Sequence, residues 1–255
     1  MISPLERLQR WWTQRLLRRH RIPQALWHEV IDASPLLSRL DRSERQRLRE
    51  LASLFLQRKA IVGATGLELD VLQRALIAAQ ASLLILNLGL DWYRGWSEVI
   101  VYPGPFVAPH REVDEAGVVH DGQRGLSGEA WSRGPVLLSW EAIDPARQRP
   151  PGANVVLHEF AHKLDFLDGA ADGIPRLHAG NTPQEWAADF SRAYADLGLH
   201  PPEEIDPYAG TSPAEFFAVM TELFFEAPER LQRHYPALYD ELRRFYRQHP
   251  LGRGH

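Results

Sequence analysis

The segment VVLHEFAHKLD, residues 155–165, is the stretch that decides the expected fold. It holds an H-E-x-x-H motif whose histidines, His158 and His162, are four residues apart in an apolar helical pattern. Residues at this spacing lie on one helix face, so both imidazoles can reach a single Zn²⁺ at about 2.0–2.1 Å. Glu159 is the candidate general base for a water beside the metal. The alternative is a pair of ordinary histidines on an apolar helix.

A catalytic zinc site uses three protein ligands and leaves one position open, so a third ligand must follow the motif. The longer pattern H-E-x-x-H-x-x-G-x-x-H is not fulfilled, because Asp165 stands in place of its glycine and Asp168 in place of its third histidine. Asp168 is an alternative carboxylate ligand. Asp165 lies on the ligand face of the same helix, where we expect it to accept a hydrogen bond from a ligand imidazole and fix its tautomer.

Two later glutamates compete for the third position. Glu185 and Glu215 each follow a Ser/Thr-Pro pair, and each fits a helix start in which the glutamate satisfies a backbone N–H. Spacing alone does not choose between metal binding and capping. Glu215 has the richer surroundings, because Tyr208 precedes it by one loop and Glu222 follows two helical turns later on the same face.

Tyr208 and Glu222 each have two interpretations. A tyrosine hydroxyl near the metal can donate a hydrogen bond to the oxyanion that forms when water attacks a peptide carbonyl. A glutamate beside the ligands can support one of the histidines. The alternatives are a packing aromatic in a loop for Tyr208 and a solvated helix residue for Glu222.

The first ninety residues are predicted to be helical. Before Pro23, leucine and tryptophan recur at helical spacing among arginines, which is typical of an amphipathic helix that lies on the domain or binds an interface or partner. From Pro23 to about Leu90 the pattern stays helical. Ser43 is the expected cap of a run through Gln57, and Leu69–Leu86 is the expected buried helix.

The character of the sequence changes after Trp92. Short β-rich segments, separated by Gly and Pro turns, are expected at Val99–Tyr102, Val113–His120 and Val136–Trp140. After the Pro150-Pro151-Gly152 break, helical stretches are expected at Asn154–Phe166, Pro183–Leu197, Pro213–Glu226 and Pro228–His249. The candidate chemistry is concentrated in these last helices.

Composition excludes several classes of protein. The 255 residues are 44% apolar, which is enough for a substantial core. The absence of cysteine excludes disulfide frameworks, thiolate zinc sites and cysteine nucleophiles. A net charge of −4 argues against nucleic-acid binding by the molecule as a whole. The N-terminus lacks the pattern of a secretory signal, and the apolar run Ala75–Leu90 is too short to span a bilayer.

The motif segment HEFAHKLD, with DPYAGTSPAEFFAVMTELFFEAP downstream, resembles the Mlc titration factor A family of bacterial metallopeptidases, whose core looks related to the catalytic domain of anthrax lethal factor. The likeness covers the chain from about Pro23 to Pro250. It continues through GLELD at 66–70, VYPGPFV at 101–107 and GPVLLSW at 134–140.

This resemblance implies roles for particular residues. His158, His162 and Glu215 would bind zinc, Glu159 would be the base, and Tyr208, seven residues before the third ligand, would stabilise the oxyanion. It also implies a bacterial cytoplasmic protein that binds the transcriptional repressor Mlc and so affects the expression of glucose-uptake genes.

These observations predict an α+β, gluzincin-like (zincin) metallopeptidase core, with a small twisted sheet over the H-E-x-x-H helix. Residues 1–92 would form an N-terminal helical layer, with 1–22 peripheral, and residues 93–255 the catalytic core, in one compact unit. We expect one Zn²⁺ per chain, and a peptide substrate along an edge strand at 99–102 or a neighbouring strand. The rival is a repressor-sequestering protein with a structural or weakly active zinc site.

Overall fold

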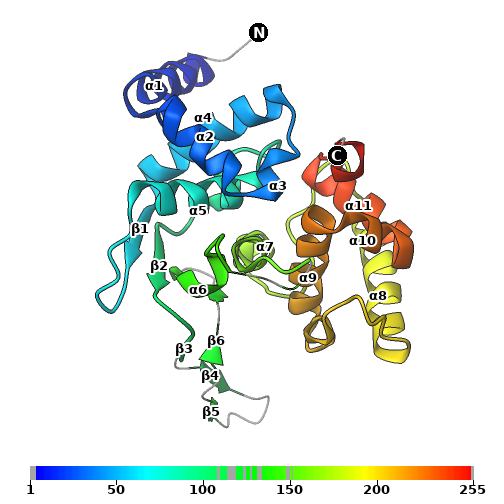
Figure 1. Ribbon diagram of the computed structural model, residues 1–255. Helices are drawn as coiled ribbons and strands as arrows, with labels where there is room; N and C mark the ends of the chain where they lie inside the picture. The colour runs from blue at the N-terminus through cyan, green and yellow to red at the C-terminus, as the bar shows by residue number, and fades with distance from the viewer. Residues whose placement is uncertain are drawn as a thin grey trace.

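Helices make up most of the chain, and the strands lie along its lower left side in Figure 1. The structure, a computed structural model, describes residues 4–107, 110–113, 119–122, 125–126, 128–130, 134–147, 150 and 152–253. Its mixed, helix-rich architecture agrees with the predicted α+β class. Over these described ranges, no helix is both long enough and apolar enough to cross a lipid bilayer.

Five helices form most of the N-terminal part. They are α1 Pro4–His20, α2 Gln24–Asp32, α3 Pro35–Ser38, α4 Arg42–Arg58 and α5 Val71–Leu84. At the start of α4, the Asp41 carboxylate accepts a hydrogen bond from Glu44 N at 2.8 Å, and the Glu44 carboxylate accepts one from Asp41 N at 3.1 Å. The predicted cap, Ser43, is therefore wrong, because this reciprocal pair starts the helix two residues earlier.

The α5 helix is the buried helix predicted for Leu69–Leu86. All ten residues from Ala75 to Leu84 are buried, and the helix packs against α4 and α7. It begins at Val71 because the Asp70 carboxylate accepts a hydrogen bond from Gln73 N at 2.7 Å.

The main sheet has four strands in the order β1-β2-β8-β7. β1, β2 and β8 run parallel, and β7 is antiparallel to β8. The strands are β1 Ala60–Gly63, β2 Glu98–Tyr102, β7 Gly128–Ala130 and β8 Val136–Ser139. β2 and β8 correspond to predicted strands, but Trp140 already belongs to the short helix α6, Trp140–Ile143. The prediction named 99–102 or a neighbouring strand as the substrate edge. The first choice is wrong, because β2 is hydrogen-bonded to a strand on each side, whereas its neighbour β1 lies at one end of the strand order.

β1 lies inside the region predicted to be helical. Only Ile61 and Val62 are β-branched in this four-residue strand, which is too short to show an alternating pattern. Its partner β2 is distant in sequence, with Ile61 opposite Val99. Pairing with a distant strand, rather than local propensity, therefore decides the structure here.

Two small antiparallel pairs follow β2. β3, Phe106–Val107, pairs with β6, Gly125–Leu126, and β4, His110–Val113, pairs with β5, Val119–Gly122. The single strand predicted at 113–120 is wrong, because its two ends belong to β4 and β5 and pair with each other. Residues 114–118 between them lie outside the described residues.

The C-terminal part is helical. Its helices are α7 Val155–Asp165, α8 Pro183–Leu199, α9 Pro213–Glu226, α10 Pro228–His234 and α11 Pro236–Tyr246. Short 3₁₀ turns lie at η1 Leu90–Tyr93, η2 Phe166–Asp168, η3 Pro207–Gly210 and η4 Pro250–Gly252. The single helix predicted from Pro228 to His249 is wrong. Tyr235 has an extended φ of −135° before Pro236, which starts a new helix.

The motif helix α7 lies at the centre of the molecule (Figure 1). Phe160 packs against aromatic rings on both sides of position 92, with ring centroids 5.7 Å from Phe55, 5.2 Å from Tyr93 and 5.6 Å from Trp96. α9 packs on α7 as well. The hydrophobic core is therefore shared by residues on both sides of position 92, and the division into two segments there stays a prediction.

Candidate metal centre

The α7 helix carries both motif histidines on one face. Its start is capped by Asn154, whose side-chain oxygen accepts hydrogen bonds from Val156 N at 3.1 Å and Leu157 N at 3.2 Å. One turn further on, the Nε2 atoms of His158 and His162 are 3.2 Å apart. Their side chains are only 11% and 10% exposed. The helical context of the motif is therefore as predicted, with both rings turned toward a common point.

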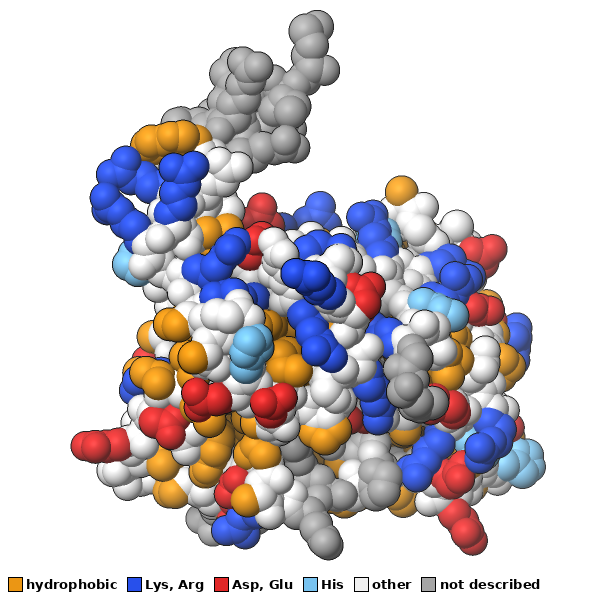
Figure 2. All heavy atoms as spheres, turned by 45° about the horizontal axis from the view of Figure 1, so that its top comes forward, with side chains coloured by type: hydrophobic (Ala, Val, Ile, Leu, Met, Phe, Trp, Pro, Cys, Tyr) orange, Lys and Arg blue, Asp and Glu red, His pale blue; other side chains and the backbone are white. Residues whose placement is uncertain are grey.

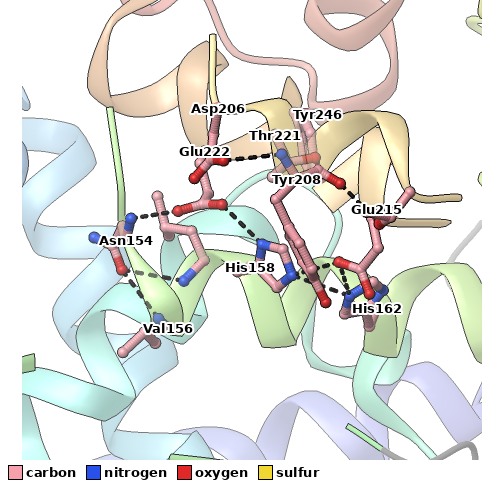
Figure 3. Close-up of polar contacts among 12 residues, drawn as sticks. Asn154, Val156, His158, His162, Asp206, Tyr208, Glu215, Thr221, Glu222 and Tyr246 are labelled. Atoms are coloured by element: carbon pink, nitrogen blue, oxygen red, sulfur yellow. Dashed lines mark hydrogen bonds and ion pairs between the residues drawn. The ribbon is translucent and has the colours of Figure 1, made fainter. Parts of the chain in front are cut away.

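The α9 helix brings Glu215 to these histidines. Ser212 Oγ accepts a hydrogen bond from Glu215 N at 3.2 Å, and Pro213 takes the first helical position. The Glu215 carboxylate points to α7, with Oε2 2.9 Å from His158 Nε2 and 3.3 Å from His162 Nε2 (Figure 3). Each of the three residues thus offers one donor atom, all within 4.8 Å of one another.

This donor set fits a divalent cation such as zinc. Ligand atoms placed tetrahedrally at about 2.0–2.1 Å from zinc lie about 3.3–3.4 Å from each other. The separations here are 3.2 Å between the histidines, and 2.9 and 3.3 Å from them to Glu215. Two imidazole nitrogens and one carboxylate oxygen are also donors that catalytic zinc takes, although other first-row divalent metals accept the same set.

Glu222 holds His158 from the other side of its ring. Its Oε1 lies 2.8 Å from His158 Nδ1, and its Oε2 accepts a hydrogen bond from Asn154 N (Figure 3). A carboxylate can only accept, so Nδ1 carries the proton in this contact. The Nε2 lone pair can then be directed at a metal.

Burial and hydrogen bonding set the protonation of the cluster when no metal is bound. Burial lowers the pKa of His158, but hydrogen bonds to Glu215 and Glu222 outweigh it and hold that pKa well above its usual value. Burial lowers the pKa of His162. For Glu215 burial favours a higher pKa, but the bonds from both histidines hold the pKa well below its usual range. Without a metal, a protonated His158 thus supplies the positive charge that balances the Glu215 carboxylate, a role that a bound cation would take over.

The predicted catalytic residues lie beside the cluster. Glu159 is buried on α7, next to His158. Tyr208 lies in η3, where the Asp206 carboxylate accepts a hydrogen bond from its N–H at 2.9 Å. Its ring centroid is 6.1 Å from that of His158, and Figure 3 shows its hydroxyl directed toward the two histidines. At 42% exposure, Tyr208 is also open to solvent.

Asp165 is buried but does not contact a ligand imidazole, so the predicted hydrogen bond is wrong. Its Oδ2 accepts a hydrogen bond from Gly173 N at 3.0 Å, and its Oδ1 is buried without a hydrogen-bond partner in the described part of the chain. Asp165 shares a helix face with His162, but its short side chain turns to the loop after α7 and does not reach the imidazole.

Gly173 is a positioning residue that the sequence prediction missed. It has a φ of 76°, and a Cβ at this position would lie 2.5 Å from the carbonyl oxygen of Pro213. Its carbonyl oxygen accepts a hydrogen bond from Trp186 Nε1 at 3.2 Å. Gly173 thus joins the end of α7, the start of α9 and the side of α8. The Asp-Gly pair at 172–173 signals a turn, but not these contacts.

The two alternative third ligands lie elsewhere. Asp168 ends η2, where its carboxylate faces Ala170 N at 3.5 Å. Glu185 lies in the first turn of α8, which Thr182 caps, and its Oε2 accepts a hydrogen bond from Thr182 Oγ1 at 2.9 Å. Among the described residues, the group that could hold a metal contains His158, His162 and Glu215, and neither alternative.

Comparisons with known proteins agree with the geometry. A family model described as glucose-regulated metallo-peptidase M90 matches residues 8–247. Proteins named Mlc titration factor A, from Yersinia pestis (strain Pestoides F) and Yersinia pseudotuberculosis (serotype O:1b, strain IP 31758), are each 39% identical to this chain over 237 residues. Each match covers 90% of this chain and 86% of the relative. The resemblance noted from the motifs is therefore confirmed.

Proposed function

The chain belongs to the M90 family of glucose-regulated metallopeptidases, and from that membership we propose that it is a zinc-dependent peptidase with a gluzincin-like centre. The observation that carries the proposal is the convergence of His158, His162 and Glu215, from two helices, at separations that suit one cation. The proposed substrates are peptides or aminopeptidase-type arylamides, and the proposed reaction is hydrolysis by water.

The chain's own residues divide the chemistry in this proposal. Zinc, when bound, supplies positive charge that polarises the peptide carbonyl and makes water a better nucleophile. Glu159 accepts a proton from the attacking water and passes it to the leaving amine. Tyr208 donates its hydroxyl hydrogen to the developing oxyanion, and its exposure leaves it accessible to substrate. Glu222 keeps His158 oriented throughout.

The β7 strand is the proposed docking edge for an extended peptide. It is the last strand in the order of the main sheet, is antiparallel to β8, and packs against α7. A substrate that added to this strand through backbone hydrogen bonds would run beside the motif helix. β2 is unsuited to this role because both of its edges are already paired.

Metal analysis combined with a peptide-library cleavage assay tests the proposal. We expect about one zinc per chain, and cleavage that is lost with a chelator and restored by zinc. The matched variant is Glu159→Gln, which keeps all three proposed ligands. It should retain zinc and lose at least about 100-fold in activity, because general-base catalysis contributes about 10²–10⁴-fold. Full activity in zinc-loaded Glu159→Gln protein, or cleavage without metal, would refute the assignment.

A second proposed role is binding of the repressor Mlc in the bacterial cytoplasm, with an effect on glucose-uptake genes. Its support is the name of the relatives, which match over 90% of this chain. The rival within this proposal is a repressor-sequestering protein whose zinc centre is structural. Peptide cleavage by the zinc-loaded wild-type chain would exclude a purely structural centre. Repressor binding by the inactive Glu159→Gln protein would show that the two roles are separable. If the wild-type chain failed to bind the repressor, the second role would be excluded and the peptidase proposal would stand.

A further inference from the structure

Charge is divided unevenly along the chain. Residues 1–60 hold 13 Lys and Arg against 6 Asp and Glu, a net charge of +7, whereas residues 61–255 hold 16 against 27, a net charge of −11. The overall charge of −4 therefore conceals a positive N-terminal region. Figure 2, which brings the N-terminal helices forward, shows Lys and Arg side chains gathered on this face.

A groove with a volume of about 760 Å³ opens in this region. It is formed by residues from Arg21, which follows α1, to Arg49 in the first half of α4, so it lies on different elements from the metal centre. Four arginines, one histidine and one acidic residue supply its charged and titratable groups: Arg21, Arg42, Arg45, Arg49, His28 and Asp32. Its volume is in the range of small-molecule sites, about 300–1,000 Å³.

Three of these arginines form no direct ion pair in the described part of the chain. Within the described residues, no carboxylate lies within ion-pair distance of Arg42, Arg45 or Arg49; Arg21 is paired with Glu50. The Arg45 Nε atom is buried and makes no hydrogen bond there. Arg49 is held in place by a bond from Nε to Ile22 O at 2.8 Å. Burial and then the charge of Arg21 lower its pKa, and the charge of Glu50 opposes this shift. The groove thus holds four guanidinium groups against Asp32 in its lining and the nearby Glu50, which leaves an excess of positive charge.

We propose that this groove binds a small organic phosphate. Guanidinium groups donate paired hydrogen bonds to phosphate oxygens, and a phosphate carries enough negative charge to offset more than one of them. Trp27, Ile31 and Leu40 form an apolar floor, which suits the carbon part of the ligand. Asp32 repels the phosphate from its own end of the groove and can accept a hydrogen bond from a ligand hydroxyl.

Calorimetric titration of the full chain at low ionic strength tests the proposal, with phenyl phosphate and inorganic phosphate as probes. Arg42→Gln should weaken binding of phenyl phosphate by about tenfold, the effect of one charge-assisted contact. Arg47→Gln is the matched control, because Arg47 lies on the same helix outside the groove and should change affinity little. Asp32→Asn should strengthen binding. Arg42 is exposed at the first position of α4, so its replacement leaves the fold intact.

Three outcomes would overturn the proposal. The first is no binding of either probe to the wild-type chain. The second is equal weakening by Arg42→Gln and Arg47→Gln, which would indicate diffuse attraction to the basic face. The third is equal affinity for the two probes, which would mean that the apolar floor takes no part and that the site is not one for an organic ligand. None of these results depends on the peptidase activity.

Discussion

The starts of α8 and α9 are alike in sequence and differ in what their glutamates do. Each has a hydroxyl residue, a proline, one further residue and a glutamate. At α8, Glu185 stays within its own helix start and bonds Thr182. At α9, Ser212 caps the helix in the same way, but the Glu215 carboxylate reaches His158 and His162 on another helix.

The difference shows that a local pattern fixes where a side chain begins, whereas tertiary packing decides what it meets. α9 packs against α7, while α8 packs against α11 and the turn η3. Gly173, close against Pro213 and bonded to Asp165, holds the start of α9 near the end of α7. The same four-residue start therefore only begins a helix at α8, whereas at α9 it also supplies a residue of the candidate metal centre.

Replacing each glutamate by alanine tests this comparison most strongly. Glu215→Ala removes a proposed ligand and should lower zinc affinity more than about 100-fold, because loss of a partner behind a ligand already costs about 10–100-fold. Glu185→Ala should leave zinc affinity unchanged. Zinc content after dialysis measures both, and the opposite ranking would make Glu185 the ligand.

A smaller effect is expected from the second carboxylate of α9. Glu222→Gln replaces the charged acceptor at His158 Nδ1 by a neutral amide and should lower zinc affinity by about 10–100-fold. Glu226→Gln is the control, because Glu226 bonds the Asn154 side chain at the same end of α7 and not an imidazole. If both variants lost zinc equally, the role of Glu222 would be to hold the two helices together rather than to orient the ring.

The far end of α7 gives a prediction that depends on pH. Burial raises the pKa of Asp165 from 3.8 to about 7, so the folded state binds more protons than the unfolded state between these values. The contribution of Asp165 to stability is present below about pH 4 and is lost as pH rises through 7. Asp165→Asn should therefore be more stable than wild type at pH 8, by about 1–3 kcal/mol, with a smaller gain at pH 5.

Thermal unfolding at both pH values, with chelator in each sample, measures this difference. Asparagine can still accept the hydrogen bond from Gly173 N, so the contact that joins α7 to the start of α9 is retained. A gain that did not grow with pH would show that Asp165 is ionised in the folded protein. A neutral Asp165 side chain would then not be part of the contact between the end of α7 and the start of α9.

The smallest expected effect comes from the two caps themselves. Thr182→Ala and Ser212→Ala should each lower the free energy of unfolding by about 1 kcal/mol, the usual value of such a cap. Only Ser212→Ala should also weaken zinc binding, by a few-fold, because Glu215 lies in the first turn of that helix. Equal zinc affinity in the two variants would show that packing alone holds Glu215 in place.

Features that depend on residues close in sequence could be predicted, whereas contacts between separate helices could not. The motif helix was predictable, because the spacing of His158 and His162 is a property of one helix turn. The proximity of Glu215 rested on resemblance to a family, since capping and metal binding have the same local pattern. The contact of Glu222 with His158 depends on how α9 crosses α7, which no local pattern contains.

The errors have related causes. Asp165 lies on the predicted helix face, but its short side chain is directed to the loop by Gly173. β1 is a strand because β2 pairs with it, although its four residues have no strand periodicity. In each case a partner outside the element decides the outcome: a loop glycine eight residues away for Asp165, and a strand distant in sequence for β1. Hydrophobic patterns within one element do not reveal such partners.

The His158 ring illustrates a consequence for dynamics. Carboxylates from a single helix engage both of its nitrogens, so the imidazole cannot flip or swing about its side-chain torsions without breaking two contacts. Exposed side chains sample rotamers on the picosecond to nanosecond timescale, and this freedom is already lost when the chain folds. Uptake of a cation would then require little additional loss of conformational entropy, and its main cost would be expulsion of one hydrogen ion from the ring.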